Sequence, residues 1–81
     1  MPNVLIVDDS AVDRNLAGGL LRQVPGLQVT FAINGRDAWQ KMERELPDLV
    51  LTDLIMPEMD GIELVANVVA TYPLVPIILM T

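Results

Sequence analysis

The sequence of 81 residues contains no cysteine and no histidine. Without cysteine, the chain forms no disulfide, offers no thiolate to a metal and has no cysteine nucleophile. Without histidine, it has no imidazole zinc ligand, no Ser-His catalytic pair and no place for a phosphohistidine of its own. The side chains that remain for chemistry are carboxylates, hydroxyls and a few cations.

Positive charge is also scarce, since five Lys and Arg stand against eleven Asp and Glu, for a net charge of −6. We expect no binding to a nucleic-acid backbone, which attracts proteins through Lys and Arg. Apolar runs such as Pro76 to Met80 fall far short of the roughly 20 residues that span a bilayer. Met1-Pro2-Asn3 lacks the basic start of a secretory signal. The sequence therefore predicts one cytoplasmic domain covering residues 1–81, with no membrane segment.

Apolar segments alternate with segments of helical period along the whole chain. Strands are predicted at residues 4–7, 28–33, 49–53 and 77–80, and the second of them alternates apolar and polar residues as an edge strand does. Between the strands the pattern predicts three helices, the second over residues 36–46 and the third over residues 61–72. The order β-α-β-α-β-α-β indicates an α/β fold, a parallel sheet with helices on both faces.

Each predicted helix carries an apolar stripe that is expected to pack on the sheet. The stripes are Val12, Leu16, Leu20 and Val24; Ala38, Trp39, Met42 and Leu46; and Ile62, Val65, Val69 and Tyr72. The pair Gly18-Gly19 weakens the first helix and suggests close packing there.

Four polar residues lie at the carboxyl ends of predicted strands: Asp8, Asp9, Asp53 and Thr81. In parallel sheets, ligands bind beyond these ends, where the order of the strands switches. We therefore expect the fold to gather these residues along one edge, although up to 73 positions separate them in the sequence.

Carboxylates brought together in this way repel one another by several kcal/mol per pair at an effective dielectric near 20. A divalent cation would remove that cost, and oxygen ligands without His or Cys favour Mg²⁺, with Mn²⁺ or Ca²⁺ as alternatives. The pattern indicates a magnesium-assisted phosphoryl site. Asp53 is the predicted phosphoryl acceptor, and the Thr81 hydroxyl could donate to the phosphoryl oxygens.

Plainer interpretations exist for each of these residues taken alone. The Asp8-Asp9 pair or Ser10 can cap the first helix, and Asp53 can be a turn residue. Asp60-Gly61 is interpreted as the start of the third helix. The basic residues Arg36, Lys41 and Arg44 are interpreted as a solvated helix face. The shared position at strand ends is what favours a site.

The motifs resemble the receiver domain of two-component response regulators over essentially the whole chain. The resemblance is carried by Val4 to Ser10, by Asn34-Gly35, by the run from Pro47 through Asp53-Leu54-Ile55-Met56-Pro57-Glu58-Met59-Asp60-Gly61, and by Pro76 to Thr81. It implies a flavodoxin-like fold and a signalling module, not an enzyme, although intact members assist their own phosphorylation and dephosphorylation. It also implies a partner, either a sensor histidine kinase or a small phosphodonor.

The resemblance assigns roles by position. Asp53 would accept the phosphoryl group, Asp9 would bind Mg²⁺ directly, and Asp8 would bind it mainly through water. The backbone carbonyl of Ile55 would be a further metal ligand. The other roles are loop shaping by Pro57 and Gly61, and a switch hydroxyl at Thr81.

One departure from the family pattern is large. The family has five βα units and a lysine after the fifth strand, and this sequence has no counterpart beyond Thr81. Lys41 belongs to the second predicted helix and does not replace that lysine. We therefore expect a truncated receiver with impaired switching. The uncovered Ile77 to Met80 edge and part of the Val12 stripe would then favour self-association into homo-oligomers.

Two alternatives to a phosphoacceptor module remain open at this point. A phosphatase with an aspartate nucleophile would need a second Asp two residues later, where Ile55 stands. An inactive receiver fragment would keep these residues and only fold and self-associate.

Overall fold

The computed structural model describes residues 2–53 and 60–80. Strands and helices alternate as the hydrophobic pattern predicts. The elements are β1 (Asn3–Val7), α1 (Ala11–Leu21), β2 (Gln28–Ala32), α2 (Gly35–Arg44), β3 (Leu49–Asp53), α3 (Gly61–Thr71) and β4 (Ile77–Met80). The longest of these helices have 11 residues, about half of what a membrane crossing takes.

The four strands form one parallel sheet in the order β2-β1-β3-β4. The chain moves outward from β1 to β2 and then returns past β1 to β3, so the strand order switches between β1 and β3. This order is flavodoxin-like. The register pairs Val7 of β1 with Thr52 of β3, which places the carboxyl ends of these two strands side by side.

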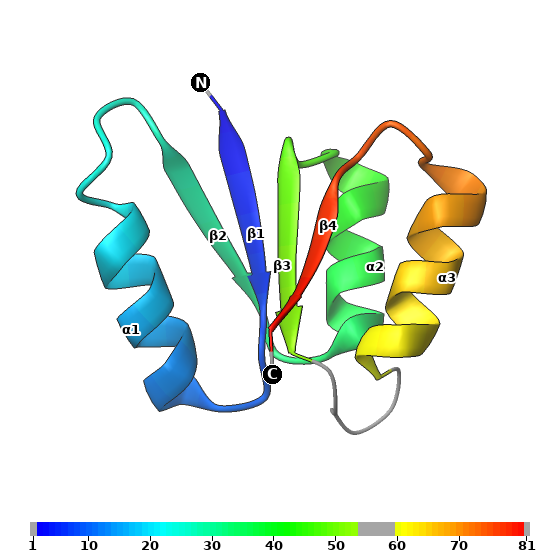
Figure 1. The fold of residues 1–81 in the computed structure, drawn as a ribbon, viewed down its shortest axis with the longest axis horizontal. Coiled ribbons are helices and arrows are strands. Elements are labelled where there is room, and N and C mark those ends of the chain that lie inside the picture. Colours follow the sequence, from blue (N-terminus) through cyan, green and yellow to red (C-terminus); the bar gives the residue numbers. More distant parts are fainter. Residues whose placement is uncertain (1, 54–59, 81) are drawn as a thin grey trace.

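Helices cover both faces of the sheet, as Figure 1 shows. Helix α1 lies on one face, and α2 and α3 lie together on the other. All three helices begin at the edge where the strands end. A side-chain oxygen accepts the N–H of the third helical residue at each start, from Ser10 for α1, Asn34 for α2 and Asp60 for α3.

The main core lies between the sheet and the α2–α3 layer. It contains strand residues and inward-facing helix residues that are at most 2% exposed: Leu5, Val7, Ala32, Ala38, Met42, Val50, Leu64 and Val68. The rings of Trp39 on α2 and Tyr72 after α3 lie with centroids 5.4 Å apart and join these two helices. Trp39 is half-buried and packs against the core, as its place in the predicted stripe indicates.

On the opposite face, α1 approaches the sheet through Gly18. A Cβ atom added to Gly18 would lie 2.5 Å from Cζ of Phe31 in β2, whereas Gly19 has nothing within 4 Å. The suggestion of close packing is therefore confirmed for Gly18 and wrong for Gly19.

The predicted stripe of α1 is exposed, as the expectation of an uncovered stripe anticipates, and the stripe of α3 packs only in part, through Tyr72. Val12, Leu16 and Leu20 of α1 are 63–68% exposed, because the helix turns Gly18 to the sheet and no described element covers its other side. In α3 the buried residues are Gly61, Leu64 and Val68, while Ile62 and Val69 point to the surface. Helix α3 is apolar on two sides, so its period alone left the buried side undecided.

Two further boundaries differ from the predictions. Helix α2 ends at Arg44, and Leu46, predicted to pack on the sheet, is half-exposed beyond the helix. The helix also begins at Gly35, one residue before the predicted start, with Asn34 as its cap. The edge position of β2 is confirmed.

Candidate functional site

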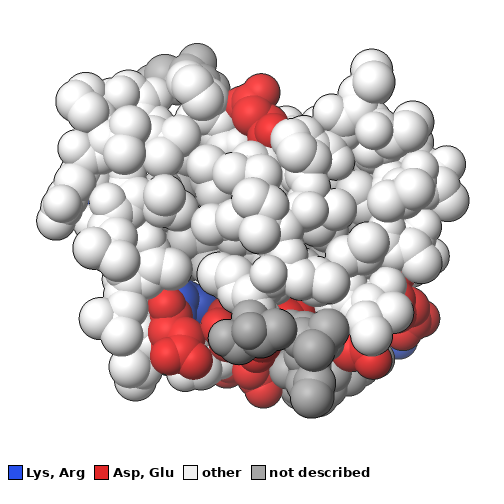
Figure 2. All heavy atoms as spheres, viewed as in Figure 1, with Lys and Arg blue, Asp and Glu red and all other residues white. Residues whose placement is uncertain are grey.

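Three carboxylates meet at the carboxyl ends of β1 and β3. Each of Asp8, Asp9 and Asp53 offers a carboxylate oxygen, and these oxygens all lie within 4.8 Å of one another. Asp8 and Asp9 directly follow β1, and Asp53 is the last residue of β3. We call this cluster the acidic rim. Figure 2 shows acidic side chains gathered along the edge of the molecule where the strands end.

Asp8 is the buried member of the acidic rim, with 6% of its surface exposed. Burial raises the pKa of its carboxyl above the ordinary value, and the negative charge of Asp53 raises it further, followed by those of Asp13 and Asp9. The N–H of Ser10 donates to Oδ1 at 2.9 Å and opposes part of this shift. Burial and the neighbouring negative charges therefore disfavour the ionised form of Asp8.

The other two carboxylates are more accessible. Asp9 is exposed, and Asp53 is half-buried beside the fully buried Thr52. Asp53 ends β3, which lies between β1 and β4, so this carboxylate stands near the middle of the sheet edge. The prediction that the fold gathers Asp8, Asp9 and Asp53 is confirmed.

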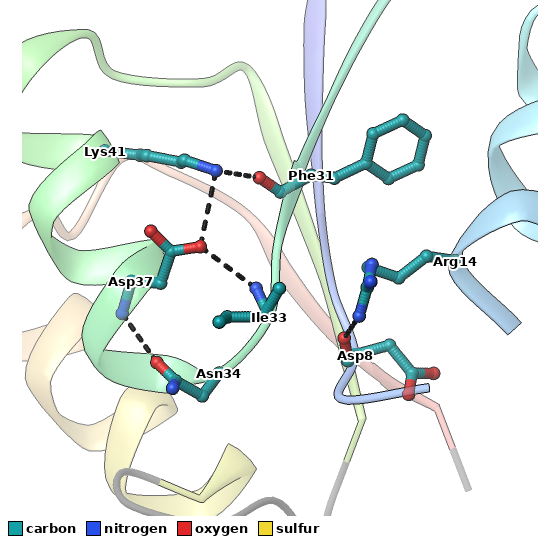
Figure 3. Close-up of polar contacts among 7 residues, drawn as sticks. All are labelled: Asp8, Arg14, Phe31, Ile33, Asn34, Asp37 and Lys41. Atoms are coloured by element: carbon teal, nitrogen blue, oxygen red, sulfur yellow. Dashed lines mark hydrogen bonds and ion pairs between the residues drawn. The ribbon is translucent and has the colours of Figure 1, made fainter. Parts of the chain in front are cut away.

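Arg14, which the sequence analysis did not predict as a site residue, also contacts this edge. Nη1 of Arg14, on the second turn of α1, donates to the main-chain oxygen of Asp8 at 2.6 Å, as Figure 3 shows. The contact ties α1 to the end of β1. The only signal in the sequence is a cation placed six residues after Asp8, and this spacing alone does not predict a main-chain acceptor.

Several predicted site residues lie outside the described residues, namely Ile55, Pro57 and Thr81. Gly61 is buried and begins α3, directly after its cap Asp60, as the plainer interpretation of Asp60-Gly61 predicts. Lys41 lies on α2 and contacts Phe31 and Asp37, so it belongs to the side of the sheet and not to the acidic rim.

A cavity of about 180 Å³ lies near the opposite ends of the strands. Its lining includes Asn3 at the start of β1, Thr30 of β2, and Lys41 and Arg44 of α2. None of the three rim carboxylates lines it. The acidic rim is therefore separate from this cavity.

The family model of the response regulator receiver domain matches residues 4–81 of this chain. The chain belongs to the response regulator receiver family. The match includes both strands that supply the carboxylates and all three described helices.

Solved receivers share the fold of this one. The signal receiver domain of a signal transduction histidine kinase from Syntrophus aciditrophicus has a TM-score of 0.92 at 34% identity. That comparison covers 100% of this chain and 62% of the solved chain. The chemotaxis response regulator CheY4 of Vibrio cholerae has a TM-score of 0.90 at 34% identity, covering 98% and 67% of the two chains.

Curated relatives are much longer proteins. A protein-glutamate methylesterase/protein-glutamine glutaminase of Treponema denticola is 46% identical over 79 residues, which are 96% of this chain and 21% of the relative. The protein of the same name from a Nocardioides species is 51% identical over 96% of this chain and 22% of its own length. This receiver thus spans about a fifth of these relatives and about two thirds of the solved receivers.

Proposed function

We propose that this receiver is a phosphoacceptor module of a two-component phosphorelay, and that Asp53 accepts the phosphoryl group. The observation that carries the proposal is the meeting of three carboxylates within 4.8 Å at the switch point of the sheet. The donor would be a sensor histidine kinase or a small phosphodonor in the cytoplasm.

Asp53 suits the acceptor role better than its neighbours do. Asp8 is buried, accepts the Ser10 N–H and has a raised pKa, whereas Asp9 is exposed. In the transfer, a carboxylate oxygen of Asp53 forms a bond to phosphorus while the bond from phosphorus to the donor breaks. The electron pair of that bond leaves with the donor, and the product is an acyl phosphate.

The donor set of the acidic rim fits a hard divalent cation. Asp8, Asp9 and Asp53 supply only oxygen atoms, and like charges surround the buried Asp8. Asp9, Asp53 and the Ile55 carbonyl would hold Mg²⁺ directly, with Asp8 acting mainly through water. Bound Mg²⁺ would neutralise negative charge on the carboxylates and on phosphoryl oxygens.

Switching would follow phosphorylation of Asp53. A phosphoryl group adds roughly two negative charges and three acceptor oxygens at this position. The Thr81 hydroxyl would turn toward these oxygens, and Pro57 and Gly61 would shape the loop after Asp53. We expect this response to be impaired in the 81-residue chain, because it contains no lysine to pair with the phosphoryl group at the acidic rim.

Intact mass measurement with Mg²⁺ and a small phosphodonor such as acetyl phosphate tests the proposal. The unmodified chain should gain the mass of one phosphoryl group, and Asp53→Asn should gain none. Asp60→Asn is the matched control, because asparagine also caps a helix and Asp60 lies outside the acidic rim. An equal adduct on Asp53→Asn, or no adduct on any folded variant, would overturn the assignment.

We further propose self-association as a second candidate function, that of an inactive receiver fragment. Val12, Leu16 and Leu20 on α1 and Ile78 and Leu79 on β4 are all at least 40% exposed. Figure 2 shows no charged side chain over most of the face that carries α1 and β4. Uncovered apolar surface of this kind favours association between copies.

A dilution series followed by sedimentation velocity tests this second candidate. We expect a discrete oligomer that dissociates on dilution and that Leu16→Lys weakens. A folded monomer at every concentration would exclude self-association. An oligomer without a phosphoryl adduct would favour the inactive fragment over the phosphoacceptor.

A further inference from the structure

Strand β2 forms a free edge of the sheet as far as residues 2–53 and 60–80 describe it, because β1 is its single neighbour there. The main chain of Gln28 donates to Pro2, and the main chain of Ala32 accepts from Asp8, so both residues face β1. Alternate residues of a parallel ladder face the same neighbour. Val29, Phe31 and the following Ile33 therefore turn their N–H and C=O groups away from the sheet.

Helix α2 places two charged side chains on this edge. Nζ of Lys41 donates to the Phe31 oxygen, and Oδ2 of Asp37 accepts the Ile33 N–H at 3.0 Å. The two side chains also form an ion pair at 3.3 Å. Figure 3 shows that the three contacts form one connected group between α2 and β2.

The two main-chain groups that Lys41 and Asp37 occupy would bond the same residue of a neighbouring parallel strand. One residue of a parallel strand bonds the oxygen of residue i and the N–H of residue i+2 on its neighbour. In this sheet, for example, the Val50 N–H donates to the Pro76 oxygen. The Phe31 oxygen and the Ile33 N–H are therefore the two groups that a single residue of an added parallel strand would need.

We propose that the Asp37–Lys41 pair blocks the free edge of β2 and prevents a second copy of this chain from adding a strand there. The interpretation of Lys41 as part of a solvated helix face is thus incomplete. Lys41 is the only lysine in the sequence, and a charged side chain on an edge strand is a recognised defence against strand addition.

The ion pair between these two side chains adds little to the stability of the fold. Its side chains are 45% and 28% exposed, and exposed ion pairs of this spacing contribute little to stability. Their position is what matters, because an added strand would have to displace both side chains.

The sequence of the edge indicates that the excluded partner is a second copy of this chain. Residues 28–33 contain no charge, no proline and no glycine, and four of the six are β-branched or aromatic. Segments with this composition pair with identical segments of other copies. An edge whose composition favours pairing with its own copy thus carries the side chains that block it.

The experiment compares Lys41→Ala and Asp37→Ala with Arg44→Ala in the full chain. Arg44→Ala removes one positive charge from the same helix without removing a side chain of the Asp37–Lys41 pair. Sedimentation velocity should show association of the first two variants at concentrations about tenfold lower than for Arg44→Ala, the scale of one lost hydrogen bond. Urea unfolding verifies that each variant is folded at the concentrations used.

Amide hydrogen exchange locates the new contact. Strand addition at β2 should slow exchange at Phe31, whose N–H points outward, whereas association through α1 or β4 leaves that amide unchanged. Lys41→Arg should restore the behaviour of the unmodified chain, because arginine also donates to a carbonyl. The proposal is overturned if neither variant associates more readily than Arg44→Ala, or if association leaves the Phe31 amide unprotected.

Discussion

At the scale of single residues, the acidic rim places three carboxylates in three different environments. Asp8 is buried, Asp53 is half-buried and Asp9 is exposed. Three clustered carboxylates suit a hard cation. Without a cation the cluster disfavours the ionised form of Asp8, since burial and like charges both raise the pKa of this residue. The binding properties of the rim are therefore linked to the stability of the fold.

Asp8→Asn tests this link through pH. The raised pKa of Asp8 means that its ionised form destabilises the folded state at any pH above that pKa, and that this destabilisation disappears as the pH falls toward the ordinary value of 3.8. We expect Asp8→Asn to be more stable than the unmodified chain at neutral pH without divalent cations. The difference should vanish in acid.

Urea unfolding of the two proteins across this pH range measures the difference. Asparagine keeps an acceptor for the Ser10 N–H, so the comparison reports mainly the charge. A stability difference that does not change with pH would contradict the explanation.

At the scale of secondary-structure elements, the starts of helices follow simple sequence rules. Ser10, Asn34 and Asp60 each cap a helix, and each is followed three residues later by an acidic residue, namely Asp13, Asp37 and Glu63. The buried side of a helix does not follow as simply, because α1 and α3 carry apolar residues on more than one side.

A matched pair in α3 tests which side is buried. Leu64 is fully buried, whereas Ile62 is 64% exposed. We expect Leu64→Ala to lower the free energy of unfolding by about 2–5 kcal/mol. Ile62→Ala should change it by about 0.5 kcal/mol or less. Urea unfolding of both variants measures these values, and equal losses would contradict the observed orientation of α3.

The two adjacent glycines of α1 form a second matched pair. Gly19→Ala should raise the free energy of unfolding by about 1 kcal/mol, because alanine favours a helix and nothing lies within 4 Å of the new Cβ. Gly18→Ala has the same helical advantage but forces the Phe31 ring to move. Its stability should therefore fall below that of Gly19→Ala by about 1–3 kcal/mol. Thermal unfolding checks this order, and Gly18→Ala at least as stable as Gly19→Ala would exclude tight packing.

At the scale of the whole molecule, charge and apolar surface are segregated. Many acidic side chains gather at the edge where the strands end, and few charged side chains lie on the face that carries α1 and β4 (Figure 2). The exposed apolar residues of these two elements are Val12, Leu16, Leu20, Ile78 and Leu79. With a net charge of −6, a cation at the acidic rim should therefore act on the stability of the entire domain.

Mg²⁺ should raise the melting temperature of the chain. A ligand at 100 times its dissociation constant adds about 2.7 kcal/mol to the stability of a folded protein. Differential scanning calorimetry with MgCl₂, compared with NaCl at equal ionic strength, measures the shift. Asp9→Ala should lose most of it, and Asp60→Asn should retain it. Equal shifts in all three proteins would show that Mg²⁺ acts by general screening and not at the acidic rim.

The sequence by itself determined the alternation of strands and helices, the places where helices begin, and the residues that end β1 and β3. These features depend on hydrophobic period, capping and proline or glycine, which act over a few neighbouring residues. The carboxylates of the acidic rim were predictable for the same reason, because parallel strands end at a common edge.

Only the tertiary structure decided which strands are neighbours and which helix sides are buried. The order β2-β1-β3-β4 depends on pairing between residues far apart in the chain, and periodicity carries no information about such pairs. The contact of Arg14 with Asp8 and the placement of Lys41 on the edge of β2 required the same information. A long side chain reaches whichever main-chain group the fold brings near, so its partner is decided by packing and not by its place in the sequence.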